Sequence, residues 1–204
     1  MKVNLTEEQK NNAWVQFYTV FSNLGLDKHY NCDVLKEELF NAPCSINEEM
    51  GTSYKGALLM HINMTMALAQ RLSKMISGTF QIDENSLLKC CIIMHLSKRH
   101  MYVENDNEWE VKNRGLNFKF KKNIEGCLKG GERRALEALN NGVKLTPFEF
   151  EAIKTLDNSE SDSTLYKTIM TIIIKEANEL GYAIEKEKYN KMFKEIENEG
   201  TTNK

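Results

Sequence analysis

Apolar side chains recur at steps of three and four residues along most of this chain, which is the spacing of one face of an α-helix. Two helix starts carry full capping signals. Thr6 is followed by Gln9 three residues on, and Thr146 is followed by Pro147 and Glu149. The pattern predicts helices over residues 6–24, 33–40, 55–76, 84–96, 132–139 and 147–156, and then over about 165–180 and 185–199.

Two interruptions of this pattern predict the remaining features. Gly181 is expected to stop one helix before the last one begins. Residues 101–120 alternate weakly between apolar and polar positions, and 105–107 are turn formers, so a small β-hairpin that carries Trp109 is expected. The predicted fold class is therefore an all-α bundle with one small β-hairpin at about residues 101–120.

Composition agrees with a single domain over residues 1–204, with a core at about 42–180, accessory helices at both ends and a frayed tail at 200–204. The net charge of −2 argues against long nucleic acid as a partner. No apolar run is long enough to span a membrane, and the polar start does not resemble a signal peptide. Five cysteines without paired spacing favour free thiols, so we expect a cytoplasmic protein.

Two histidines, His61 and His95, fall on apolar faces of consecutive long helices. A single histidine in such a place is usually a core residue with its hydrogen bonds satisfied, but two raise the prospect of a shared site. Catalytic metal sites generally need three protein ligands, often including a carboxylate. The position after His95 would suit that carboxylate, and it is Leu96.

Several short segments resemble, in their order and spacing, the HD-domain metal-dependent phosphohydrolases. The resemblance covers roughly residues 42–180 and implies an HD-domain-like helical bundle. The segments that carry it are Ala42-Pro43, Tyr-Lys-Gly-Ala-Leu-Leu-Met-His at 54–61, Ile-Ile-Met-His-Leu-Ser-Lys at 92–98, Lys-Gly-Gly-Glu at 129–132 and Leu-Thr-Pro-Phe-Glu at 145–149.

Most of the metal ligands that the resemblance implies are replaced. His61 and His95 match the first two, but the other positions hold Leu96, Gly130, Leu156 and Asn178. Leucine can neither coordinate a metal ion nor orient an attacking water. We therefore expect no metal, no cofactor and no hydrolysis, with His61 and His95 as vestiges of the family's site.

Cationic residues remain around the expected pocket. The resemblance places Lys98 near a substrate phosphate, and ammonium and guanidinium groups bind phosphate with or without a metal. Arg133 and Arg134 fit this pocket or, equally, a solvated helix face with local acidic partners. The predicted phosphate ligands are Lys98, Arg99, Arg133, Arg134 and Lys144, and the predicted pocket residues are His61, His95 and Trp109.

The favoured functional hypothesis is an inactive HD-like protein that binds a nucleotide or another small phosphorylated molecule without hydrolysing it. Because proteins of this size in the family are common in phage, the resemblance also suggests a sponge for nucleotide immune signals. One alternative is a protein–protein interaction scaffold, and another is a residual phosphohydrolase that uses His61, His95 and a carboxylate such as Asp157 or Glu132. A homo-oligomer is compatible with each of these functions. An open cavity beside the two histidines would favour binding, and a closed one would favour the scaffold.

Overall fold

The computed structural model describes residues 5–121, 130–156 and 168–202, with side chains as far as Lys191. Over these residues the chain is mostly helical with one small antiparallel hairpin, which confirms the coarse fold class. The elements are α1 (Glu7–Asn23), η1 (Leu26–Lys28), α2 (Cys32–Asn41), η2 (Glu48–Met50), α3 (Ala57–Ile76), α4 (Glu84–Leu96), η3 (Ser97–His100), β1 (Tyr102–Glu104), α5 (Glu108–Arg114), β2 (Phe118–Phe120), α6 (Gly130–Asn140), α7 (Pro147–Thr155) and α8 (Ile169–Thr202).

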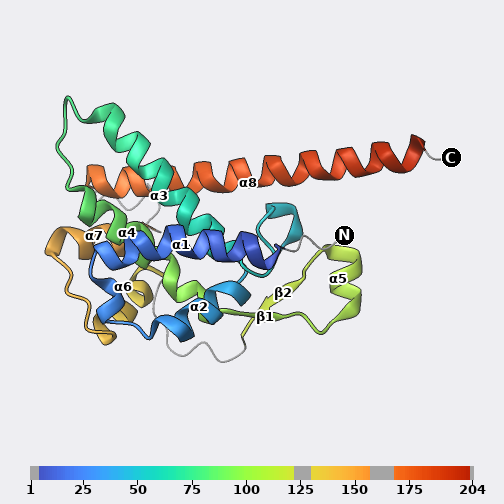
Figure 1. The fold of residues 1–204 in the computed structure, drawn as a ribbon, viewed down its shortest axis with the longest axis horizontal. Coiled ribbons are helices and arrows are strands. Elements are labelled where there is room, and N and C mark those ends of the chain that lie inside the picture. The colour runs from blue at the N-terminus through green and yellow to red at the C-terminus, as the bar shows by residue number, and fades with distance from the viewer. Residues whose placement is uncertain (1–4, 122–129, 157–167, 203–204) are drawn as a thin grey trace.

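Helices α3 and α4 pack against each other at the centre of the fold (Figure 1). Helix α8 packs along α3, α6 and α7 pack on α4, and α1 packs on α3. Phe17 and Phe21 of α1 have no exposed surface, so this helix is part of the core that the sequence placed at 42–180. Among the described residues, no helix combines the length and the apolar character needed to cross a membrane.

The prediction that Gly181 ends a helix is wrong. Helix α8 continues from Ile169 to Thr202, through both Gly181 and the expected frayed tail, and residues 203–204 lie outside the described part. The reason is tertiary packing, because α8 lies along α3 and its backbone passes close to His61 at Gly181. A Cβ atom at Gly181 would lie 3.2 Å from His61 Cε1. Residues 157–167, which include the connection between the helices predicted at 147–156 and about 165–180, lie outside the described residues.

The hairpin forms inside the predicted limits, but its connection is a helix. Tyr102 pairs with Phe120 and Glu104 with Phe118. Asn107 was expected in a turn, and its side chain instead caps α5 by accepting a hydrogen bond from the Glu110 backbone N–H. Trp109 consequently lies on α5 with 63% of its surface exposed, rather than on the hairpin.

One buried ion pair joins the start of α7 to α4. Glu149 completes the predicted capping box with Thr146, and its carboxylate accepts two hydrogen bonds of 2.9 Å from Lys89 Nζ. Burial alone would raise the pKa of Glu149, but these donors and the Thr146 N–H outweigh it and bring the pKa below its usual value. The pair therefore helps to fix α4, the helix that carries His95.

We expect Gly181→Ala to destabilise the protein by about 1–2 kcal/mol, although alanine favours a helix by about 1 kcal/mol. The added methyl group would press on His61, whose ring is held by α3 and by hydrogen bonds on both nitrogens. Urea unfolding followed by circular dichroism measures this change. Gly78→Ala is the matched control, because a Cβ there meets nothing within 4 Å. Equal effects of the two substitutions would contradict the prediction.

The lowered pKa of Glu149 predicts that the folded protein becomes less stable in acid. Its carboxylate binds a proton more readily in the unfolded chain, so its contribution to stability is present above about pH 4.5 and is lost as the pH falls through the lowered folded pKa. Urea unfolding at pH 7, 5 and 3 should show this loss. In Glu149→Gln the loss should be smaller, and the variant should be about 2 kcal/mol less stable at pH 7. Glu151→Gln, on the same helix, should behave like the unmodified chain.

Candidate functional site

The structure brings His61 of α3 and His95 of α4 together. Their ring centroids lie 4.9 Å apart in an edge-on arrangement, and neither side chain has any exposed surface. They are enclosed because α1 and α8 pack on α3, and α6 and α7 pack on α4. A shared histidine centre therefore exists, but it is buried.

His61 is held by two residues of α8. Its Nδ1 lies 2.7 Å from Glu185 Oε2, and its Nε2 lies 3.0 Å from Asn178 Oδ1. An ionised carboxylate only accepts hydrogen bonds, so Glu185 fixes the N–H of a neutral imidazole on Nδ1. Nε2 then carries a lone pair, which the Asn178 amide can meet by turning its NH₂ group towards it.

Tyr182 connects His61 to a thiol and an ammonium group. Its ring lies 4.0 Å from the His61 ring, and its hydroxyl lies 3.0 Å from Cys44 Sγ and accepts a 2.8 Å hydrogen bond from Lys98 Nζ. Burial raises the pKa values of both Cys44 and Tyr182 above their usual values. Both groups are therefore protonated at neutral pH. The ammonium group of Lys98, which was predicted to bind phosphate, donates here to a protein hydroxyl.

His95 differs from His61 because neither of its ring nitrogens has a hydrogen-bond partner among the described residues. Burial lowers its pKa well below 6.5, and the charges of Lys98 and Arg134 act in the same direction. His95 is therefore a neutral imidazole with a free lone pair. An unsatisfied buried polar group costs about 1–3 kcal/mol, so this arrangement needs an explanation.

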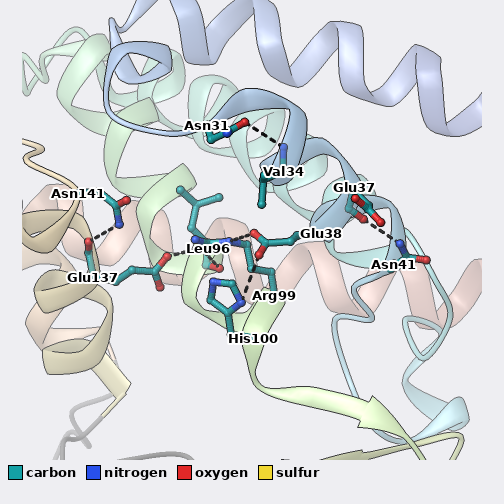
Figure 2. A network of polar contacts seen from close by, with 10 residues as sticks. All are labelled: Asn31, Val34, Glu37, Glu38, Asn41, Leu96, Arg99, His100, Glu137 and Asn141. Atoms are coloured by element: carbon teal, nitrogen blue, oxygen red, sulfur yellow. Dashed lines mark hydrogen bonds and ion pairs between the residues drawn. The ribbon is translucent and has the colours of Figure 1, made fainter.

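Arg99, predicted to bind phosphate, is instead bound by protein groups (Figure 2). Its Nε donates to Glu38 Oε2 at 2.7 Å, and its Nη1 donates to Glu137 and to the Leu96 backbone oxygen. Only 7% of the side chain is exposed. These bonds tie η3 to α2 and α6, so Arg99 has a structural role in the described fold.

The other predicted cations do not gather in one place. Arg134 acts electrostatically on His95, so it lies near the histidine centre, and Arg133 is a half-buried neighbour on α6. Lys144 is exposed in the connection from α6 to α7, where its backbone oxygen accepts a hydrogen bond from Lys89 in the first half of α4. Trp109, on α5, is absent from the histidine centre as described above.

The ligand set implied by the HD resemblance does not fit a metal ion. Leu96 and Leu156 are packed in the hydrophobic core, at 1% and 6% exposure, and Gly130 is the exposed first residue of α6. Asn178 does lie beside His61, as the matched position implies. The alternative carboxylate Asp157 lies outside the described residues, and Glu132 is half-buried on α6. The residues at these positions therefore support no metal-dependent hydrolysis of the kind that the resemblance implies.

An accessible site lies elsewhere, in two adjoining cavities of about 230 Å³ each beside the hairpin. Both are lined by Lys55, Glu104 and Phe118, and neither is lined by His61 or His95. Lys55 Nζ and Glu104 Oε1 form a solvent-exposed ion pair of 2.6 Å at their shared border. Further lining residues are Glu48, Tyr54, Asn105, Asn117 and Tyr189 in the first cavity, and Glu38, Arg99 and Tyr102 in the second.

Sequence reasoning missed Cys44, Tyr182, Glu185 and Lys55. Asn178 and Glu185 are seven residues apart, which is two helical turns, so a continuous α8 would have shown them on one face. Because a helix was predicted to end at Gly181, Asn178 and Glu185 were placed on different helices. Nothing in the sequence indicates that Cys44 or Lys55, both from the irregular segment between α2 and α3, reach these places.

Comparison with protein-family models gives no match, and neither the curated proteins nor the solved structures contain a match to this chain. The HD relationship therefore stays a prediction from the short motifs.

We expect Arg99→Ala to destabilise the protein by about 3 kcal/mol, because it leaves two carboxylates without their partner in a largely buried place. Arg71→Ala, on an exposed position of α3, is the control and should change stability by less than about 0.5 kcal/mol. Thermal or urea unfolding measures both. Wild-type stability in Arg99→Ala would mean that the network contributes nothing.

Proposed function

We propose that this protein binds a nucleotide, or another small phosphorylated molecule, in the two cavities beside the hairpin and does not hydrolyse it. The observation that carries the proposal is Lys55, an exposed ammonium group on the border that the cavities share. Each cavity alone is small for a metabolite, but together they fall in the range of known ligand sites, about 300–1,000 Å³.

The Lys55–Glu104 ion pair supports phosphate binding because it is replaceable. About half of Lys55 and two thirds of Glu104 are exposed (49% and 66%), and such surface pairs contribute only about 0–1 kcal/mol. A phosphate group offers Lys55 a more highly charged acceptor. The replacement of Glu104 by phosphate therefore needs little energy.

The other lining residues favour a nucleotide over a bare polyphosphate. Tyr54 and Tyr189 offer aromatic rings for a base, and Asn117 offers an amide. Glu48 and Glu104 are acidic, so they would repel a chain of phosphates but accept hydrogen bonds from ribose hydroxyls or a base amino group. One phosphate at Lys55 with a nucleoside in the first cavity, as in a nucleoside monophosphate or a cyclic nucleotide, balances these charges best.

Binding without cleavage follows from the buried histidine centre. The two imidazoles lie in the core, and leucines occupy two of the ligand positions that hydrolysis would need. A bound molecule would consequently be released unchanged. That property suits a protein that sequesters a nucleotide signal, which is the sponge role suggested by the resemblance.

A protein–protein scaffold is the second candidate, and two observations favour it. The centre around His61 and His95 is closed, which is the outcome expected for a scaffold. The last part of α8 also extends well beyond the rest of the fold in Figure 1. The calorimetric experiment below separates the two candidates, because a scaffold need not bind any nucleotide.

Isothermal calorimetry with mononucleotides and cyclic nucleotides should show binding at micromolar protein concentration, and chromatography should recover the ligand intact. Lys55→Ala should weaken that binding about tenfold or more, because it removes a charge-assisted hydrogen bond of about 1.5–3 kcal/mol. Lys28→Ala, at an exposed position on η1, is the control and should bind like the unmodified chain.

Three outcomes would contradict the proposal. No heat with any member of the panel would remove nucleotide binding and favour the scaffold. Unchanged affinity in Lys55→Ala would remove the proposed location. Metal-dependent turnover that is lost in His95→Ala would show that hydrolysis has been retained.

A further inference from the structure

We propose that Cys44, His61 and His95 form a closed binding site for one thiophilic divalent cation, Zn²⁺ foremost, which stabilises the fold. This site is independent of the proposed nucleotide binding. It also differs from the ligand set that the HD resemblance implies, because it uses a sulfur donor from the segment before η2 and no carboxylate.

The three donors are already close to coordinating distance. One ligand atom from each of Cys44, His61 and His95 lies within 4.8 Å of the other two. Zinc bonds of about 2.0–2.3 Å place tetrahedral ligands roughly 3.3–3.6 Å apart, so each atom would have to move inward by about 1 Å. All three residues are buried, and they come from three separate segments, so such a bond would cross-link the centre of the fold.

His95 gives the independent sign of a missing ligand. Its side chain has no exposed surface, and both of its nitrogens lack a partner in the described part of the chain. Coordination would use the lone pair of one nitrogen, which no donor among the described residues meets. A buried water is the other possible partner, and the experiment below distinguishes it from a metal ion.

His61 is held in the form that a metal ion requires. Glu185 accepts the Nδ1 proton at 2.7 Å, an outer-shell contact typical of metal-bound histidines, and leaves the lone pair on Nε2. Asn178 Oδ1 lies 3.0 Å from that nitrogen. When a metal ion binds Nε2, the amide would present Oδ1 instead of its NH₂ group. An oxygen donor would then lie near a fourth coordination position and complete a site with two nitrogens, one sulfur and one oxygen.

The charges of the surrounding groups are compatible with a divalent cation. Coordination would deprotonate the Cys44 thiol, and its proton would leave to solvent. The thiolate and the Glu185 carboxylate then balance the two positive charges. The positive charges of Lys98 and Arg134 oppose the cation. The Lys98 ammonium group is, however, bound to the Tyr182 hydroxyl, which is 3.0 Å from Cys44 Sγ and can donate to the thiolate.

The donor types determine the ion and its role. Thiolate and imidazole select Zn²⁺ or Co²⁺ over Mg²⁺ and Mn²⁺, which prefer oxygen ligands. Catalytic zinc keeps a position open to water or substrate, whereas structural zinc is enclosed by protein. Because all three donors here are buried, the site is of the enclosed, structural kind.

The test uses the full chain, purified without chelators, and measures its metal content by mass spectrometry. We expect up to one zinc per chain, and one Co²⁺ per metal-free chain with a thiolate-to-cobalt absorption band. Zn²⁺ at about 100 times its dissociation constant should raise the melting temperature of the metal-free protein by about 5–10 °C. Cys44→Ser should lose the thiolate-to-cobalt absorption band and most of the increase in melting temperature that Zn²⁺ causes. Cys32→Ser, a matched control at a half-buried cysteine on α2, should keep both.

X-ray absorption at the zinc edge of the unmodified protein gives a second readout if Cys44→Ser fails to fold. One sulfur at about 2.3 Å and two imidazole nitrogens at about 2.0–2.1 Å would support the site. The absence of bound metal together with no shift on adding Zn²⁺ would overturn it and favour water as the partner of His95. A first shell without sulfur, or an unchanged cobalt band in Cys44→Ser, would overturn it as well.

Discussion

The burial of His61 is the constraint on which the rest of the structure depends. The fully buried imidazole of His61 has a hydrogen-bond partner for each nitrogen, and both come from α8, at Asn178 and Glu185. These partners are two helical turns apart, so α8 must be continuous between them, and the residue that faces the ring between them must be small. Gly181 meets that requirement at the expense of helix propensity. A polar contact inside the core thus determines the course of the longest helix.

Charged and titratable groups have different environments at the three places that bear on function. The histidine centre holds mostly neutral groups, because burial keeps Cys44 and Tyr182 protonated and His95 unprotonated. The Arg99 network neutralises one guanidinium with two carboxylates and joins three elements. Lys55 and Glu104, which line both cavities, meet in solvent, where an ion pair is weak enough for a ligand to replace it. Replacing the partners of Arg99 would cost more free energy than replacing the partner of Lys55. This difference makes Lys55 the better candidate for binding a ligand.

Local signals predicted the fold well where they were complete. The capping boxes at Thr6 and Thr146 and the bounds of α4 were confirmed, because hydrogen bonds and periodicity within one segment decide them. Features that depend on distant partners could not be predicted in this way, and the helix stop predicted at Gly181 was wrong. Gly181 has the local properties of a stop, but packing against α3 overrides them. Arg99 matches a phosphate ligand by position, yet Glu38 and Glu137, from two other helices, bind it. The meeting of His61 with His95 was foreseeable from two apolar helix faces, whereas the arrival of Cys44 from an irregular segment was not.

The substitutions at the expected hydrolytic positions and the proposed metal site are consistent with each other. A catalytic metal needs access for water and substrate, which requires polar, hydrated surroundings and prevents close packing. Leu96 and Leu156 fill the core instead, so the surroundings of His61 and His95 become dry. In such an enclosed site, two imidazoles without a carboxylate among the direct ligands are better matched to a buried thiol, which supplies one negative charge when it is deprotonated. Loss of the hydrolytic ligands would then leave the centre suited to stabilising the fold, while ligand binding depends on an accessible surface such as the one at Lys55.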